Sequence, residues 1–129
     1  MTEIEEKIND YVYKELAALL FEMVPEFREE VEKSGSMEVL LDQNVYWFMY
    51  DFSLSLSEKI RKNVSSDFVS KAFMYINTVG EGHNLQLQNI VIVGILEILY
   101  TEELDRNLVC SMLSEKLQKE FNGLSRLYR

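Results

Sequence analysis

The chain has 129 residues, of which 47% are hydrophobic and 27% are charged, and its formal net charge is −9 at pH 7. This balance is typical of a folded protein and excludes a disordered one, and the length suits one domain spanning residues 1–129. The charge argues against nucleic acid as a partner, because the phosphates would be repelled.

The negative charge is concentrated in the first part of the chain. Residues 1–51 contain 13 Asp or Glu and 4 Lys or Arg, which gives −9, whereas residues 52–129 contain nine of each and are neutral. An acidic half joined to a neutral half predicts a surface that attracts a basic partner protein.

Two features bear on the cellular compartment. The single cysteine, Cys110, cannot form an internal disulfide, and the first six residues lack the basic and apolar regions of a signal peptide. The longest apolar run, residues 90–100, has 11 residues and contains Glu97, whereas a membrane span needs ~20. We therefore expect a cytoplasmic protein with no membrane partner.

The scarcity of helix breakers, one Pro and five Gly, and the recurrence of apolar residues every three or four positions predict an all-α protein. We expect a single-domain bundle of about six or seven helices around a central apolar helix at residues 85–100. The first helix begins at a capping box formed by Thr2 and Glu5 and ends before Pro25.

The second predicted helix is short. Pro25 suits its first position, Phe27 and Val31 face the core, and Gly35 lies in the break that ends it. We expect its carboxylates to point outward: Glu26, Glu29, Glu30 and Glu32.

A third helix is predicted from near Asp42 to Lys62, and a fourth begins at a cap formed by Ser65 or Ser66 and ends at Gly80. Their apolar residues repeat at steps of three and four, which places one stripe of each helix against the core. The stripe of the third helix consists of Leu41, Val45, Phe48, Met49, Phe52, Leu56 and Ile60.

The segment 85–100 is the predicted central helix. Its run from Ile90 to Val93 would also suit a buried strand, but 16 uninterrupted residues far exceed the ~5–6 of a usual strand, and no second strand is predicted. Two further helices follow and meet at Ser114, which can cap the second of them. Arg126 and Arg129 suit the negative pole at its end.

Catalytic and metal-binding patterns are sparse. His83 is the only histidine and lies in a predicted loop, so neither a zinc-binding pair nor a di-iron motif can form. Cys110 has no histidine nearby to act as its base, and we interpret it as a buried apolar residue. Glu26, Glu29 and Glu30 share a helix face but lack the six or more oxygens of a calcium site. We expect no metal, no cofactor and no enzymatic activity.

The segment 46–52 is unusually aromatic. Helical spacing leaves Trp47 and Tyr50 outside the core stripe, beside Asp51. These aromatic residues either pack against a neighbouring helix or anchor a protein interface, where Trp and Tyr are enriched. Phe21, opposite the apolar face of the first helix, is a further candidate anchor. Glu97 either touches solvent along a narrow edge of the central helix or makes a structural hydrogen bond.

Two segments resemble landmarks of a family of small bacterial all-helical proteins: MVPEF at residues 23–27 and LQNIVIVGILEIL at residues 87–99. The resemblance covers residues 10–128 as an order of helices. Members of that family have no assigned activity and are associated with toxin–immunity loci. The late landmark pairs an Asn with a Glu, here Asn89 and Glu97, which we expect to shape the fold. The resemblance implies an immunity-like protein that sequesters a toxic effector domain.

The favoured function is thus a binding module that neutralises a basic toxin domain. The acidic half would accelerate association, and the aromatic anchors would hold the complex. The alternative is a self-associating structural or regulatory protein, in which a homodimer covers the aromatic residues and the acidic half maintains solubility. An enzyme ranks third. The predicted partner-binding residues are Glu26, Glu29, Glu30, Asp42, Trp47, Tyr50 and Asp51.

Overall fold

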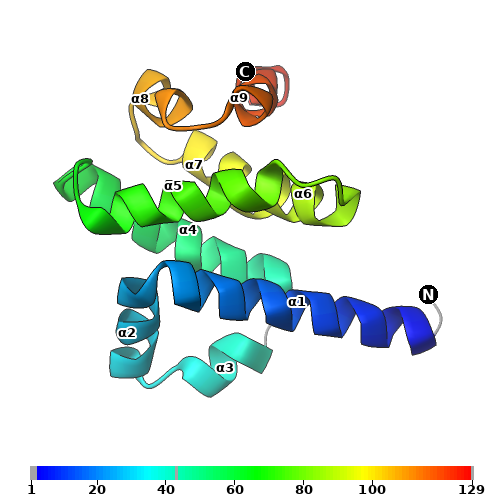
Figure 1. Ribbon diagram of the computed structural model, residues 1–129. Helices are drawn as coiled ribbons and strands as arrows, with labels where there is room; N and C mark the ends of the chain where they lie inside the picture. Colours follow the sequence, from blue (N-terminus) through cyan, green and yellow to red (C-terminus); the bar gives the residue numbers. More distant parts are fainter. Residues whose placement is uncertain (1–2, 43, 129) are drawn as a thin grey trace.

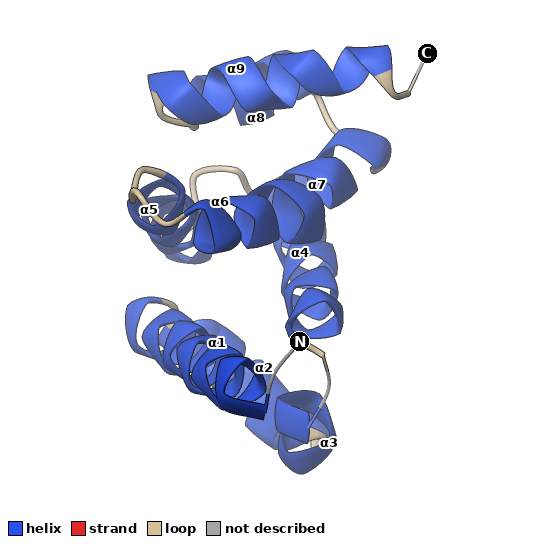
Figure 2. Cartoon of the chain, turned by 90° about the vertical axis from the view of Figure 1, so that its right-hand side faces the viewer, coloured by secondary structure: helices blue, strands red, loops and turns tan. Residues whose placement is uncertain are grey.

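The computed structural model describes residues 3–42 and 44–128, without the side chains of residues 5–11 and 40–42. All regular structure in these ranges is helical, which confirms the predicted all-α fold (Figures 1 and 2). In chain order the elements are α1 (Glu3–Met23), α2 (Pro25–Ser34), α3 (Met37–Asp42), α4 (Val45–Lys62), α5 (Asp67–Gly80), α6 (Leu85–Val91), the π-helical segment η1 (Ile92–Leu96), α7 (Glu97–Thr101), α8 (Arg106–Ser111), α9 (Glu115–Gly123) and the 3₁₀ turn η2 (Leu124–Arg126).

Local sequence signals account for most helix ends. The side chain of Ser66 accepts the backbone N–H of Val69 at 3.4 Å and so begins α5. Asn84 and Asp105 cap α6 and α8 in the same way. Gly35 ends α2 with a φ of 71°, in the left-handed region that glycine adopts without steric cost. The predicted ends of the second and fourth helices are confirmed.

The long third helix of the prediction begins at Val45, three residues after Asp42. The chain forms the short helix α3 first, and α4 then begins at Val45 because Asn44 has a non-helical ψ of 142° and its side chain accepts the N–H of Tyr46 at 2.8 Å. Asp42 is therefore the last residue of α3. The predicted capping box of Thr2 and Glu5 lies outside the described residues or side chains.

The C-terminal helices meet at Ser114, as predicted, but the expected side-chain cap is absent. Ser114 Oγ is buried and makes no hydrogen bond with the part of the chain that the structure describes. The junction is held from α5 instead, because Asn77 Oδ1 accepts the Ser114 N–H at 2.9 Å and Asn77 Nδ2 donates to the Met112 carbonyl at 3.1 Å. Arg126 lies in η2, and Arg129 is outside the described residues.

The helices form three groups along the molecule. Figure 2 shows α1, α2 and α3 at one end, α8 and α9 at the other, and α4 to α7 between them. Segment 85–101, which comprises α6, η1 and α7, runs parallel to α4, because Tyr46 contacts Asn89 near one end and Arg61 contacts Glu102 near the other. Helix α5 runs in the opposite direction across both (Figure 1). Segment 85–101 is helical, as predicted, and shares the centre of the molecule with α4.

Helix α4 and the π-helical segment pack tightly against each other at Gly94. A Cβ on residue 94 would lie 2.9 Å from the Cβ of Met49, which is shorter than side chains tolerate. The buried hydroxyl of Ser53 donates to the carbonyls of both Met49, at 2.7 Å, and Gly94, at 3.0 Å. Gly94 lies within the π-helical segment, where the Glu97 N–H reaches back five residues to the Ile92 carbonyl. Ser53 thus binds a carbonyl where the regular helical pattern is interrupted.

The core is rich in aromatic side chains. Tyr75 is fully buried, its hydroxyl donates to the Leu16 carbonyl at 3.0 Å, and its ring meets that of Phe52 at 6.1 Å in an edge-to-face contact. Burial raises the pKa of Tyr75 well above its usual value. Phe27 contacts Phe52 at 5.2 Å, so the core joins α1, α2, α4 and α5. The predicted core positions Phe27 and Val31 are buried, as are all predicted stripe residues of α4 from Val45 to Ile60.

Candidate partner-binding surface

The carboxylates of α2 do not all point outward, which corrects the sequence-based expectation. Glu26 binds Lys71 of α5 at 2.7 Å, and Glu30 binds Lys59 of α4 at 2.5 Å and accepts the hydroxyl of Ser55 at 2.6 Å. These half-buried pairs join α2 to two other helices. The residue type predicted a charged surface, but the lysine partners come from distant parts of the chain and could not be identified from spacing.

Electrostatics agree with this structural role. The hydrogen bond that Lys71 donates to Glu26 is the main cause that raises the pKa of Lys71. The second oxygen of Glu26 is buried and has no hydrogen-bond partner among the described residues. Of the other two carboxylates on α2, Glu32 binds Arg28 within the same helix at 2.9 Å, and Glu29 is exposed. Glu29 is therefore the α2 carboxylate best placed to meet a partner.

An exposed aromatic pair lies on α4. Trp47 is 62% exposed and Tyr50 is 36% exposed, and their rings meet at 5.8 Å with an interplanar angle of 80°. Asp51 and Leu54 follow at the spacing that places them on the same face of the helix. We call Trp47, Tyr50, Asp51 and Leu54 the outer α4 surface. The structure thus brings together three of the predicted site residues.

Asp51 is the acidic member of this surface. It is exposed, but neighbouring residues partly shield it from water and this desolvation raises the pKa of its carboxyl group. No cation binds it in the described part of the chain. The basic residues of α4 lie near its C-terminal end and already have acidic partners: Lys59 with Glu30, Arg61 with Glu102, and Lys62 with Glu58.

The remaining candidates are placed as follows. The side chain of Asp42 lies outside the described residues, so its role stays a prediction. Phe21 packs against the core rings of Phe27, at 6.0 Å, and Phe48, at 5.7 Å, and is not a free anchor.

The Asn and Glu of the late landmark bind neighbouring elements. Asn89 Nδ2 donates to the Tyr46 hydroxyl at 3.1 Å. Glu97 is half-buried and accepts a hydrogen bond from the Tyr128 hydroxyl at 3.4 Å. Desolvation, followed by the charge of Glu97 and this hydrogen bond, raises the pKa of Tyr128. Both observations agree with the expected role in shaping the fold.

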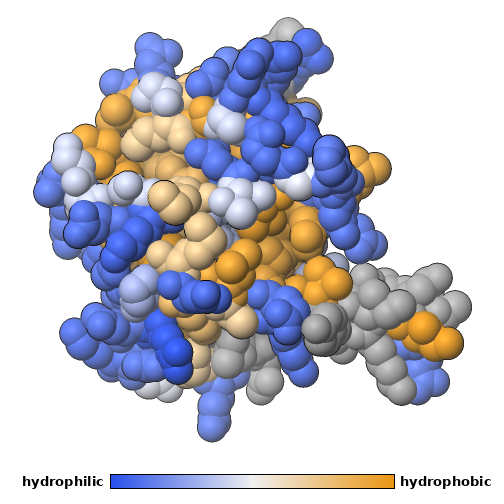
Figure 3. Space-filling view, in the orientation of Figure 1, coloured by the Kyte–Doolittle hydropathy of each residue, from blue (hydrophilic) through white to orange (hydrophobic). Residues whose placement is uncertain are grey.

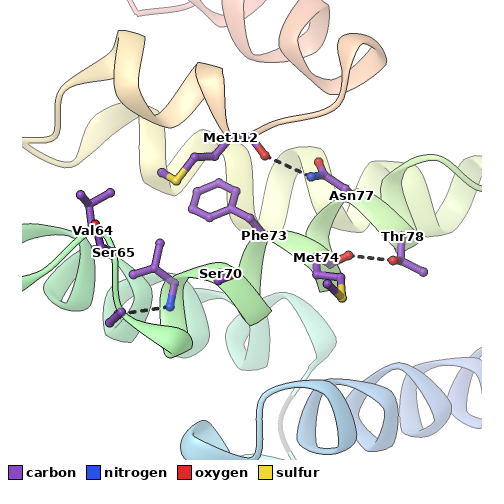
Figure 4. A pocket seen from close by; sticks show the side chains of 10 residues that line it. Val64, Ser65, Ser70, Phe73, Met74, Asn77, Thr78 and Met112 are labelled. Atoms are coloured by element: carbon purple, nitrogen blue, oxygen red, sulfur yellow. Dashed lines mark hydrogen bonds between the residues drawn. The ribbon is translucent and has the colours of Figure 1, made fainter.

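A second feature of the surface is a shallow groove of about 620 Å³ beside α5, which the sequence did not predict (Figure 4). The sequence signal that could have indicated this groove is Met74, an apolar residue of α5 that the structure leaves exposed. Figure 3 shows apolar surface across this face of the molecule. No charged residue lines the groove, and the side chain of Asn77 donates a hydrogen bond to the Met112 carbonyl. The lining residues are Val64, Ser65, Ser66, Val69, Ser70, Phe73, Met74, Asn77, Thr78 and Met112.

The described residues contain no group of three or more His, Cys, Asp or Glu side chains that could hold a metal ion. His83 is exposed in the loop before α6. Cys110 is half-buried, less than expected, and its sulfur lies 3.7 Å from Asn122 Oδ1 of α9. Among the helices of the described residues, none has the length and apolar character to cross a membrane.

Comparison with known proteins gives one match. No curated protein and no solved structure matches the chain. A family model described as "Domain of unknown function (DUF7674)" matches residues 17–129, which include the outer α4 surface and all of α2 to α9. The chain therefore belongs to this family of unknown function.

Proposed function

We propose that the protein is an immunity-type binding module that neutralises a basic effector domain by direct contact through the outer α4 surface. The resemblance of residues 23–27 and 87–99 to immunity-associated proteins supports the class of function. The acidic character of residues 1–51 supports the sign of the partner's charge.

The observation that carries the proposal is the exposed pair of Trp47 and Tyr50. Large aromatic side chains that remain exposed while the rest of their segment builds the core are candidates for interface anchors. Trp and Tyr are the residue types that most often dominate binding energy, each with ~2 kcal/mol or more when truncated. The edge-to-face contact holds both rings in a defined arrangement before the partner arrives, which lowers the entropic cost of binding.

Exposed carboxylates around the molecule would steer the partner. Glu15, Glu22, Glu29 and Glu38 are exposed and make no ion pair with the described residues. Charge of this kind accelerates association by ~10–10³-fold. Glu26 and Glu30 contribute less, because Lys71 and Lys59 already neutralise them.

Self-association through the same surface is the second candidate function. Val93 on η1 is 39% exposed and Trp47 on α4 is 62% exposed, and apolar side chains of this kind are what a second copy would cover. A symmetric dimer of this kind would bring two Asp51 carboxylates and two acidic halves together. That repulsion favours a basic partner over a second copy.

A growth assay tests the proposal. Bacteria that express a basic effector domain encoded beside this gene should grow when the chain is coexpressed, and Trp47→Ala with Tyr50→Ala should abolish the rescue, because loss of both anchors weakens binding at least ~30-fold. Leu85→Ala removes an apolar side chain from α6 that is even more exposed than Trp47, and it should preserve the rescue. Equal rescue by the wild type and the double variant would contradict a role of this surface.

A further inference from the structure

We propose that the outer α4 surface recognises an arginine side chain of the partner, with the guanidinium group stacked on Trp47 and paired with Asp51. This inference rests on the proposed function and names the chemical group that the surface selects.

The chain itself shows the arrangement that such recognition needs. The Arg106 guanidinium lies 3.9 Å from the centre of the Tyr100 ring, and its Nε donates to the Tyr100 carbonyl at 3.3 Å. Lys59 Nζ lies 5.4 Å from the centre of the Phe68 ring while it binds Glu30. In both cases a cation contacts an aromatic face and an oxygen acceptor at the same time.

The outer α4 surface has the aromatic face and the oxygen acceptor but no cation among the described residues. Trp47 and Asp51 are four residues apart on one helix, which places them as neighbours on the same face. Trp is the strongest aromatic partner for a cation. Desolvation raises the pKa of the Asp51 carboxyl group, and a guanidinium beside it would lower that pKa and stabilise the charged form.

The geometry favours arginine over lysine. A guanidinium group is planar, so it can stack on the indole ring and present N–H donors at its edge to the carboxylate. It is also less strongly hydrated than an ammonium group, so less hydration is lost when the partner covers the surface.

A second copy of this chain is a poor source of that arginine. Arg28 binds Glu32, Arg61 binds Glu102, and Arg106 stacks on Tyr100. Only Arg126, among the arginines that the structure describes, is exposed without such a contact. A second copy could therefore offer only Arg126 from the described residues, and the partner is the favoured source of the arginine.

Trp47 is the only tryptophan, so its indole N–H resonance reports on this surface alone. The experiment titrates the full chain with tetra-arginine, tetra-lysine and tetra-citrulline peptides and follows this resonance. We expect a saturable shift with tetra-arginine, at least ~threefold weaker binding of tetra-lysine, and no binding of the neutral tetra-citrulline.

Two matched variants separate recognition from general attraction. Asp51→Asn and Glu58→Gln each remove one negative charge from α4, but Glu58 already binds Lys62 at 2.7 Å. Asp51→Asn should weaken tetra-arginine binding at least ~fivefold, and Glu58→Gln should change it less than ~twofold. Incorporation of 5-fluorotryptophan, which changes only residue 47, should also weaken binding because fluorine reduces the negative potential of the ring face.

The outcomes distinguish this inference from the proposed function. Equal affinities for arginine and lysine peptides, or equal losses in the two variants, would show attraction by charge alone and overturn arginine recognition. An indole resonance that moves with protein concentration in the absence of peptide would also overturn it, because a second copy would then cover the surface. Absence of any shift with tetra-arginine would do the same. The growth assay would still decide the proposed function in each case.

Discussion

At the scale of single residues, two positions show how closely this core is specified. Gly94 lies where no side chain fits, since a Cβ there would approach Met49 to 2.9 Å. Tyr75 carries a polar hydroxyl but is fully buried, and this hydroxyl donates a hydrogen bond to a backbone carbonyl of α1. Both residues contribute to stability through contacts with residues that are distant in sequence, and a substitution at each position tests that contribution.

Gly94→Ala should destabilise the protein by about 1–3 kcal/mol, because the added methyl group forces α4 and η1 apart. Gly123→Ala is the matched control: Gly123 is also helical, and a Cβ there meets no atom within 4 Å. The control should be neutral or stabilise by up to about 1 kcal/mol. Urea denaturation of the two variants measures the difference, and equal stabilities would contradict the close packing.

The burial of Tyr75 predicts a loss of stability at alkaline pH. Its pKa is raised in the folded state, so the folded protein holds the phenol proton more tightly than the unfolded chain does. The resulting stabilisation is complete below the unfolded pKa of about 10 and declines as the pH rises above it. Tyr75→Phe removes the hydrogen bond to Leu16 and should lower the free energy of unfolding by about 0.5–1.5 kcal/mol at pH 7. Because the variant has no phenol proton at this position, its stability should also fall less steeply between pH 9 and 11 than that of the wild type. Denaturation across this pH range checks the slope; parallel curves would refute it.

At the scale of helices, α2 illustrates how charged residues hold a short element in place. Phe27 and Val31 bury its inner face, and the two pairs made by Glu26 and Glu30 fix its flank to α5 and α4. Such half-exposed pairs contribute little individually, since solvent screens them. Their main effect is to set the position of α2 relative to its neighbours.

Glu30→Gln should destabilise the protein by about 0.5–1 kcal/mol, because it removes the charge that binds Lys59 and weakens the bond from Ser55. Glu29→Gln, one residue away on the exposed side, should change stability by less than about 0.5 kcal/mol. Thermal denaturation at low and high salt measures both variants, and the cost of Glu30→Gln should shrink at high salt. A salt-independent effect would argue against the ion pair.

At the scale of the whole molecule, the distribution of charge should control how fast a basic partner binds. Glu15→Lys, Glu22→Lys and Glu29→Lys together change the net charge from −9 to −3 on exposed positions of the acidic half. Association should slow and lose much of its salt dependence, and dissociation should change less.

The control for this charge reversal lies in the other half. Glu103→Lys, Glu115→Lys and Glu120→Lys produce the same net charge on exposed positions beyond residue 51. Stopped-flow association kinetics with the effector domain compare the two triple variants. Equal slowing would show that only net charge matters, and that its location in the acidic half does not.

The sequence predicted what local chemistry determines and missed what distant contacts determine. The ends of α2 and α5 follow from Gly35 and Ser66, and helical periodicity placed Trp47 outside the core. The pairing of Glu26 with Lys71 was beyond such reasoning, because it joins residues 45 positions apart. The same holds for the π-helical segment at Gly94, which depends on its contact with α4.

Synthesis of the chain leaves α4 without its central partner for some time. Ser53 and Gly94 are 41 residues apart, so the inner face of α4 is complete long before segment 85–101 exists. At roughly 5–20 residues per second on the ribosome, this delay lasts on the order of 2–8 seconds. During that interval Met49 and its apolar neighbours can pack only against α1, α2, α3 and, once it has been made, α5. Part of the inner face of α4 therefore stays uncovered until segment 85–101 is made, and its apolar side chains are exposed to aggregation and to chaperones during synthesis.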